Sequence, residues 1–394
     1  MYQSLEVVTL NDGTRGEVGV LTAPDPEWAD KVQEFLSHQD EIWKWQNKIL
    51  LSSSLDISIY YYLLLQNEKI VSSVMSAESR GVGIRGHVWT PPQHRRRGAF
   101  ARLQDVQLRH FHERGGKYLV LNTEFNSVAY NIYRVSGFKE VEPFSGHLHH
   151  LTLPETELDN SYFQSAESVV EPLSWRHWPA AARLFMGHFP GLIRSAPLKL
   201  VGRRNPEKAL LEELHRASCI STDERPRVVV LRSVLTDAVV GLAAWGWHPR
   251  ARDTCVVDVY CHPHFWDRAG ALIDALELPD AKRIVAYVDI DSEDKARCLS
   301  DRGFRGVAEW SNFPVDLCRR PFDRLPLSAA EGSVTRGAWW LMRSIDVPIS
   351  KAWRKLNDIT DAPGQIPVRW PRSPMTHALR VDLRQFERLT GVAT

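Results

Sequence analysis

The sequence lacks the features of several protein classes. Its five cysteines are an odd number and no two of them form a C-x-x-C pair, so we expect reduced thiols rather than a disulfide framework. No apolar run is long enough to cross a bilayer, and the first residues, MYQSLEVVTLNDG, do not join a basic segment to an apolar one. We therefore expect a cytoplasmic protein with no signal peptide and no contact with a membrane.

The sequence also has almost no net charge. Its formal charge is +1, although charged residues make up 25% of the chain. Proteins dedicated to nucleic acids are usually more basic, so no nucleic-acid partner is expected. The segments HLHH (147–150) and CHPH (261–264) contain histidines but not the paired spacing of a structural metal site, so no metal is expected either.

What the first 153 residues contain is a regular alternation of helices and strands. After a first strand (LEVVTL), a helix pair is followed by a β-hairpin (57–78), a strand (81–90), a helix (97–114), a strand (117–124) and a helix (126–137) with Asn126 as its N-cap. More strand closes the unit. A strand joined through a helix to the next strand predicts a parallel pair.

The same order of elements recurs later in the chain, which predicts a duplicated domain. We expect a first domain over 1–153, a polar linker over 154–167 and a second domain over 168–316. Each domain is predicted to be α/β (α+β), with a mixed, partly parallel sheet flanked by helices. Residues 317–394 do not fit a third copy and receive no function, although 336–359 has a helical pattern and 377–386 a strand-like one.

The segment HRRRGAF (94–100) lies where the first domain passes from a strand into a helix. The backbone N–H groups of a helix's first turn have no partners inside the helix, and they lie at the positive end of its dipole. Gly98 has no Cβ, so a ligand can approach the backbone closely. Because the neighbouring arginines add positive charge, this segment is interpreted as a binding site for a diphosphate.

Two motifs give the sequence a resemblance to the GNAT family of N-acetyltransferases. The first is a strand with a valine and a proline, followed by RRRGAF, in which Phe100 replaces the family's final small residue. The second, downstream at the family's usual distance, matches at every position: Asn126, Ala129, Tyr133, Gly137 and Phe138. The resemblance covers residues 5–153 and is fainter in the second copy. It implies two tandem GNAT folds.

The resemblance also implies a co-substrate and a site. Acetyl-CoA would place its pyrophosphate on the amides of residues 96–100 and its pantetheine arm along residues 88–90. A strand amide near Val88 would polarise the thioester carbonyl, and Tyr133 would protonate the leaving thiolate. The implied CoA-binding residues are Val88, Trp89, Thr90, Arg95, Arg96, Arg97, Gly98, Ala99, Phe100, Asn126 and Tyr133.

The sequence leaves the general base open. The candidates are His87, Glu78 and Glu124, of which His87 has an ordinary pKa near neutrality. A plain strand histidine is the competing interpretation of His87, and a half-buried core tyrosine that of Tyr133.

The second copy lacks the residues of the motifs. When the copies are aligned on Pro91 and Pro263, Asp267 replaces Arg95, Ala269 replaces Arg97 and Leu272 replaces Phe100. Alignment of the Gly-Phe pairs at 137–138 and 303–304 places Leu299 at the position of Tyr133. A carboxylate repels a diphosphate and leucine cannot donate a proton, so this copy is predicted to be structural.

The sequence therefore predicts an enzyme that moves an acetyl or short acyl group from CoA to an amine of a small-molecule or peptide acceptor. One alternative is a non-catalytic acyl-CoA sensor or scaffold, against which the intact Tyr133 argues. Another is a tRNA-dependent aminoacyl transferase of the tandem type, which would need a large basic groove and no CoA site.

Overall fold

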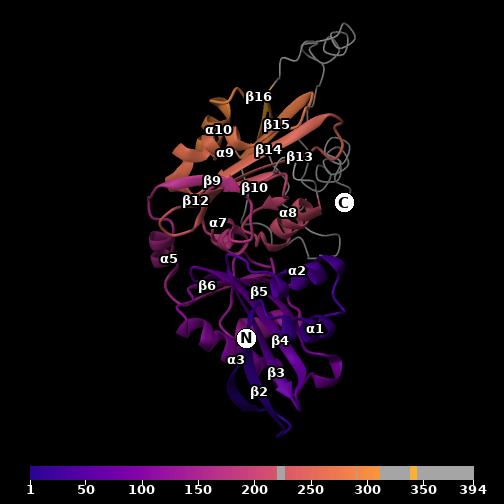
Figure 1. The fold of residues 1–394 in the computed structure, drawn as a ribbon. Helices are drawn as coiled ribbons and strands as arrows, with labels where there is room; N and C mark the ends of the chain where they lie inside the picture. Colours follow the sequence, from indigo (N-terminus) through magenta and orange to yellow (C-terminus); the bar gives the residue numbers. More distant parts are fainter. Residues whose placement is uncertain (220–226, 290, 311–337, 344–394) are drawn as a thin grey trace, which may run out of the picture. The chain divides into compact units, whose positions relative to one another are not determined.

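The computed structural model describes residues 1–219, 227–289, 291–310 and 338–343 (Figure 1). The chain divides into two compact units, one formed by residues 1–243 and 259–277, the other by residues 244–258 and 278–394. Each unit is described by itself below.

The first unit contains an eight-stranded sheet with the strand order β1-β2-β3-β4-β5-β6-β8-β7. Its strands are β1 (Tyr2–Thr9), β2 (Arg15–Ala23), β3 (Ser58–Gln66), β4 (Lys69–Ser79), β5 (Val82–Trp89), β6 (Tyr118–Asn122), β7 (Lys139–Glu140) and β8 (His147–Leu151). Of the neighbouring pairs, β5 and β6 are parallel and the others are antiparallel. The predicted mixed, partly parallel sheet is confirmed.

Local sequence explains how the strands of this sheet are connected. Asn67 and Glu68 join β3 to β4 with φ angles of 48° and 64°, the left-handed conformations that a two-residue type I′ turn requires. The turn is therefore two residues long. Gly115, with a φ of 78°, ends the helix that connects β5 to β6.

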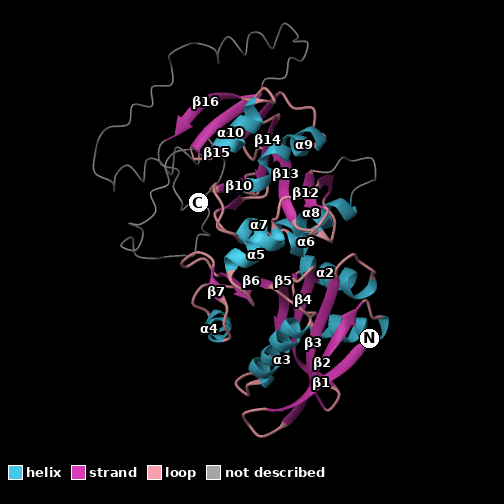
Figure 2. Cartoon of the chain, turned by 90° about the vertical axis from the view of Figure 1, so that its left-hand side faces the viewer, coloured by secondary structure: helices cyan, strands magenta, loops and turns pink. Residues whose placement is uncertain are grey.

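Helices from the first part of the chain lie beside the sheet (Figure 2). They are α1 (Pro26–Phe35), α2 (Glu41–Ser52), α3 (Ala99–Glu113) and α4 (Val128–Val135). The side chain of Asp25 caps α1 by accepting hydrogen bonds from the backbone N–H groups of Glu27 and Trp28. Helix α3 packs on β3 and β4, where its buried Leu103 joins Tyr62 and Val74 in the core.

The predicted linker contains a structured helix, α5 (Glu155–Tyr162). Arg183, which is fully buried, donates hydrogen bonds to Asp159 at 2.6 Å and to Glu155 at 2.9 Å. These charge-assisted bonds hold α5 against α7 (Ala182–Met186). The other elements that follow α5 in this unit are β9 (Ser168–Pro172), α6 (His177–Ala180), β10 (Ile193–Ser195), β11 (Leu200–Val201), α8 (Glu207–Cys219), β12 (Val228–Ser233), the 3₁₀ helix η2 (Pro263–Arg268) and α9 (Ala269–Ala275). Strands β13 (Val239–Trp247) and β14 (Thr254–Cys261) each begin in one unit and end in the other.

The described part of the second unit has the same local topology as the end of the first sheet. Its elements are β15 (Arg283–Asp289), α10 (Glu293–Ser300), β16 (Arg305–Trp310) and β17 (Ala338–Arg343). Strand β15 is parallel to β14 and antiparallel to β17, which also pairs with β16. The order β15-β17-β16 repeats β6-β8-β7.

Strand β17 corrects one expectation about the chain's last part. The helical pattern over residues 336–359 is wrong for residues 338–343, which form this strand because their backbone pairs with β15 and β16. The strand-like pattern at 377–386 lies outside the described residues.

Candidate active site

The candidate site begins where two parallel strands separate. Strand β5 pairs with β6 only at Val82, Gly83 and Ile84, although β6 itself continues to Asn122. Residues 85–89 of β5 remain paired with β4 alone, and one extra residue interrupts that pairing, because Gly86 lies opposite Met75 and Trp89 lies opposite Ser73. This β-bulge bends β5, and beyond Ile84 the edge of β5 that faced β6 has no strand partner among the described residues; we call this unpaired edge the opening.

The loop that follows β5 presents unpaired backbone donors. The loop continues after the short 3₁₀ helix η1 (Pro92–His94) to Gly98. Gly98 has a φ of 76° and is the N-cap residue of α3. None of the backbone N–H groups from residue 96 to residue 100 has an acceptor in the described parts of the chain. A Cβ on Gly98 would lie 2.8 Å from Asn11 Oδ1, so a glycine is required here for space as well as for its backbone angle. The loop therefore offers several free backbone donors next to a glycine.

Arg97 differs from its two neighbours because it is paired with a carboxylate. It donates to Asp12 at 2.5 Å and to Thr14 Oγ1 at 2.8 Å. Hydrogen bonds from Thr14 and then from Arg97 lower the pKa of Asp12 to about 2, so this carboxylate is ionised at neutral pH. The charge of Arg97 is thus matched within the protein.

Arg95 and Arg96 have no carboxylate partner among the described residues. Arg95 donates to the carbonyl of Thr90 at 2.9 Å, and its guanidinium carbon lies 5.1 Å from the centre of the Trp89 ring. Arg96 is exposed, with a φ of 62°. These two side chains are the cations of the loop that an anionic ligand could meet.

Tyr133 lies on α4, beside the opening. It is 5% exposed, and its ring meets the ring of Phe100 edge to face at 5.8 Å. Burial raises the pKa of the Tyr133 phenol, so the hydroxyl is protonated at neutral pH. The helix is capped by Ser127, whose Oγ accepts from the N–H of Tyr130 at 3.1 Å. Asn126, predicted as the cap, lies one residue earlier in a left-handed conformation.

His87 lies on the bulge, but it is enclosed by amides. Its Nδ1 is 2.9 Å from Gln39 Oε1 and 3.2 Å from Asn47 Nδ2, and its Nε2 is 3.0 Å from Gln46 Oε1. Burial lowers the pKa of His87 to about 3. The ring is therefore neutral and a weak proton acceptor near pH 7, which favours the structural interpretation.

The two acidic candidates for the base lie elsewhere. Glu78 is opposite Gly83, before the strands separate, and it forms a two-pronged ion pair with Arg114 at 2.7 and 2.9 Å. Glu124 is exposed in the turn that follows β6. Neither carboxylate contacts residues 85–89 among the interactions of the described chain.

A carboxyl group that the sequence did not indicate does contact this segment. Glu207, the first residue of α8, is 9% exposed, and its Oε1 would lie 3.4 Å from a Cβ on Gly86. Its other oxygen accepts from Asn205 Nδ2 at 3.1 Å. Burial raises the pKa of Glu207 to about 8. The group can therefore exchange a proton near neutral pH.

One histidine, His147, contacts the loop that leads to Glu207. His147, on β8 opposite Asn122, accepts at Nδ1 from the backbone N–H of Asn205 at 3.4 Å. Burial lowers the pKa of His147 to about 3, so it is neutral. It supports the loop that carries Glu207.

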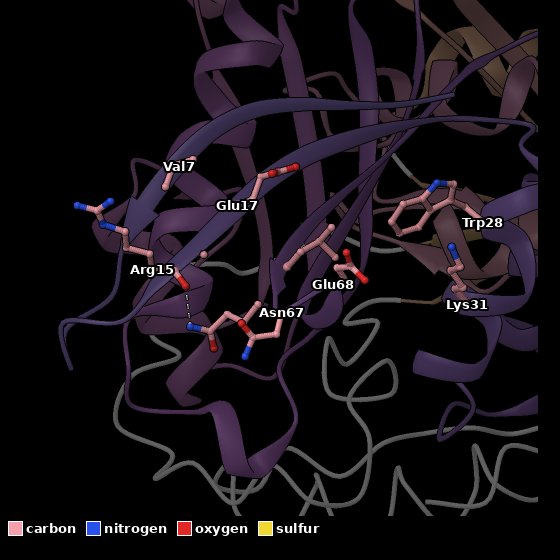
Figure 3. A pocket seen from close by; sticks show the side chains of 10 residues that line it. Val7, Arg15, Glu17, Trp28, Lys31, Asn67 and Glu68 are labelled. Carbon is pink, nitrogen blue, oxygen red and sulfur yellow. Dashed lines mark hydrogen bonds between the residues drawn. The ribbon is translucent and has the colours of Figure 1, made fainter.

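The structure also contains a hollow in this unit that none of these residues lines. It is an open depression of about 500 Å³ near the β3–β4 turn (Figure 3). Its lining includes Trp28, Lys31 and Glu68, and Gln66 Nε2 donates to the Arg15 carbonyl at 3.1 Å on its wall. None of the predicted site residues lines it.

Among the residues that the structure describes, no cluster of three or more His, Cys, Asp or Glu side chains could hold a metal ion. None of the helices in those ranges has both the length and the apolar character needed to span a membrane.

The whole chain was compared with protein-family models, curated proteins and solved structures, and only the solved structures gave a match. No protein-family model matches the chain, and no curated protein matches its sequence. The chain is similar to GNAT acetyltransferases of known structure.

Three examples give the extent of this likeness. The GNAT acetyltransferase of Staphylococcus aureus is 13% identical with a TM-score of 0.30, and the match covers 34% of this chain and 99% of that one. A GNAT acetyltransferase of Bacillus anthracis is 9% identical with a TM-score of 0.30, over 46% and 96% of the chains. The PaiA N-acetyltransferase of Thermoplasma acidophilum, solved with coenzyme A, is 11% identical with a TM-score of 0.26, over 34% and 98%. At these values the likeness by itself assigns neither activity nor substrate.

Proposed function

We propose that the N-terminal domain, residues 1–153, is an N-acyltransferase that moves an acyl group from coenzyme A to an amine. The observation that carries the proposal is the opening between β5 and β6 after Ile84, which leads directly to the unpaired amides of residues 96–100. An extended pantetheine arm needs exposed strand backbone, and a pyrophosphate needs several N–H donors. Both are present in one continuous stretch of chain.

The arm and the phosphates are assigned to successive parts of this stretch. The pantetheine amides pair with the backbone of Val88 and Thr90 as an added strand would. The pyrophosphate lies on the amides that follow Arg95, where Arg95 and Arg96 supply positive charge. Gly98 allows the close approach.

The chemistry is a direct transfer. The amine nitrogen attacks the thioester carbonyl carbon, a C–N bond forms, and the C–S bond breaks. A backbone N–H at the bulge, near Val88, donates to the carbonyl oxygen as negative charge develops there. Tyr133 donates its phenolic proton to the departing thiolate.

We assign the general base to Glu207 rather than to His87, Glu78 or Glu124. The base must remove a proton from the amine, and its pKa should lie close to the working pH. Glu207 meets the bulge at Gly86 and its pKa is raised to about 8, whereas His87 titrates near 3 and Glu78 is paired with Arg114.

We propose that the second copy has no acyl-transfer site of its own, although its residue Glu207 serves the first copy, and that it extends to β17, because β17 completes the order β15-β17-β16. Leu299, at the position of Tyr133, is fully buried and has no proton to give. The acceptor is proposed to be a small molecule or a peptide.

The test measures free thiol released when the full-length protein is incubated with acyl-CoA and pooled amines. We expect release that falls about a hundredfold or more in Tyr133→Phe. Tyr130→Phe is the matched control, because it removes a hydroxyl from the same helix and leaves Tyr133 in place. Binding of CoA without release under any acceptor would favour a sensor, and the absence of binding would contradict the proposal.

A further inference from the structure

Arg85 is the buried charge that the proposed mechanism does not use. It is the first residue of β5 beyond the last pair with β6, and it is 2% exposed. Its guanidinium carbon lies 5.1 Å from the ring centre of Tyr133 and 5.3 Å from those of Phe100 and Phe138. Nε, Nη1 and Nη2 all lack a hydrogen-bond partner in the described parts of the protein.

This arrangement is incomplete without an anion. A guanidinium has five N–H donors, and burying it without acceptors is costly. Three aromatic faces compensate part of that cost through cation–π contact, but they accept none of the hydrogen bonds in a planar, two-pronged geometry. Burial lowers the pKa of Arg85 only to about 10, so the side chain is charged at neutral pH.

The position of Arg85 in the opening identifies which part of a ligand it would meet. Thr90 is five residues further along the strand, or about 16 Å. It lies just before residues 95–98, the diphosphate loop, which is proposed to bind the pyrophosphate. Arg85 is therefore at the far end from the phosphates. The contact with Tyr133, the proposed proton donor to sulfur, places it at the acyl end.

The face of the strand separates donor from acceptor. Successive side chains of a strand point to opposite faces. Arg85 packs against residues of α3 and α4, whereas Gly86 meets Glu207, the proposed base. A carboxylate on Arg85 would therefore come from the acyl group and not from the amine.

We propose that the acyl donor of this domain is a thioester of CoA whose acyl chain ends in a carboxylate, and that Arg85 binds that carboxylate through two N–H donors. The inference rests on the acyltransferase function proposed above and names its donor class. In the reaction, the amine displaces the thiolate as before, and the terminal carboxylate stays ionised and paired with Arg85 throughout.

The experiment compares two thioesters with chains of equal length. Succinyl-CoA carries the terminal carboxylate, and butyryl-CoA replaces it with a methyl group. With the full-length protein, we expect calorimetry to show tighter binding of succinyl-CoA by about ten- to a hundredfold, and kcat/KM with a common amine to follow the same order. Malonyl-CoA and glutaryl-CoA then report the distance at which the carboxylate is held.

Two variants assign the preference to Arg85. Arg85→Met is expected to remove most of the succinyl-to-butyryl ratio, and Arg85→Lys to keep part of it, because an ammonium retains the charge but not the planar pair of donors. Arg134→Met is the matched control, since it removes an exposed arginine from α4 next to Tyr133 and should leave the ratio unchanged.

The outcomes separate this inference from the proposal on which it rests. If butyryl-CoA or acetyl-CoA binds and reacts as well as succinyl-CoA in the unaltered protein, the donor assignment is overturned and the acyltransferase function stands. If no thioester binds, both fail. The comparison of thioesters needs no variant, so it decides the matter even if Arg85→Met does not fold.

Discussion

Residues 91–98 and residues 263–270 lead from a strand to a helix over the same number of positions, but they do so in different ways. In the first segment, η1 has three residues and is followed by a loop in which Arg96 and Gly98 have φ angles of 62° and 76°. In the second, η2 has six residues and continues directly into α9, with Gly270 inside that helix. A left-handed residue ahead of the helix is what exposes a run of backbone donors; a continuous helical turn does not.

The strands that precede these segments show the same contrast. In both places a parallel pair holds for three residue pairs and then ends. In the first copy the next side chain is the unpaired Arg85. In the second, the aligned residue is the apolar Val257, and the adjacent Asp258 forms a fully buried ion pair of 2.5 Å with Lys295 of α10. A parallel strand pair of this length is therefore compatible with a ligand-binding opening or with a closed core, and the side chains decide which.

The largest effect is expected from breaking the closed core. Lys295→Met leaves a buried carboxylate without its ammonium partner, which should lower the free energy of unfolding by about 3–5 kcal/mol. Urea denaturation of the full chain measures the loss. If the second copy has no acyl-transfer site of its own, kcat per folded molecule should stay unchanged; a large fall in kcat with unchanged stability would contradict the comparison.

The next effect concerns the base that the first copy uses. Glu207→Gln keeps the hydrogen bond with Asn205 feasible but cannot accept a proton, so kcat should fall about a hundredfold. The rate of the unaltered enzyme should rise with pH up to about 8, the pKa of this group, and that limb should vanish in the variant. Glu124→Gln, at an exposed carboxylate, serves as the control and should keep both rate and limb.

A smaller effect is expected at the diphosphate loop. In Gly98→Ala the added Cβ would meet Asn11 at 2.8 Å and strain the left-handed backbone, so the dissociation constant for CoA should rise about tenfold. Gly13→Ala carries the same strain at a φ of 80° but has no atom within 4 Å of the new Cβ. Equal CoA binding by the two variants, measured by calorimetry, would remove the loop from the site.

A further effect is a pH dependence of stability. The pKa of Glu207 is about 8 in the folded state against an ordinary value of 4.5, so between these values the folded protein holds a proton that the unfolded chain releases. Stability is therefore lost as pH rises through this range and is constant above it. Between pH 6.5 and 8 the free energy of unfolding should fall by roughly 2 kcal/mol, and the fall should be absent in Glu207→Gln. A flat profile in the unaltered protein would argue against a buried carboxyl here.

Much of the fold could be predicted because it depends on local pattern. The hairpin, the helix between β5 and β6 and the parallel pair follow from alternation, glycine positions and the order of elements. Strand β2 was missed, since its residues, RGEVGVLTA, include two glycines that weaken the strand signal, yet pairing with both β1 and β3 determines it. The sequence pattern of residues 338–343 is helical, but they form strand β17, because pairing with β15 and β16 selects their conformation.

The residues of the candidate site also differ in whether local sequence could predict them. The loop around Gly98 and the position of Tyr133 could be predicted from motifs of fixed spacing. Glu207 could not, because no local feature distinguishes it from other helix-starting glutamates; burial in the folded chain raises its pKa, and its neighbour Gly86 lies 121 positions earlier in the chain. For His87 the sequence indicated a titratable group, whereas three amides from outside its own strand keep it neutral.

The contact between Glu207 and Gly86 has a consequence for how residues 1–153 depend on the rest of the chain. If the carboxyl that activates the nucleophile is contributed by chain lying beyond the first repeat, a fragment ending at residue 153 would retain the donor pocket yet be catalytically crippled. The two halves would then be a single evolutionary unit, in which the silent copy persists because its leading segment furnishes a part that the working copy does not own.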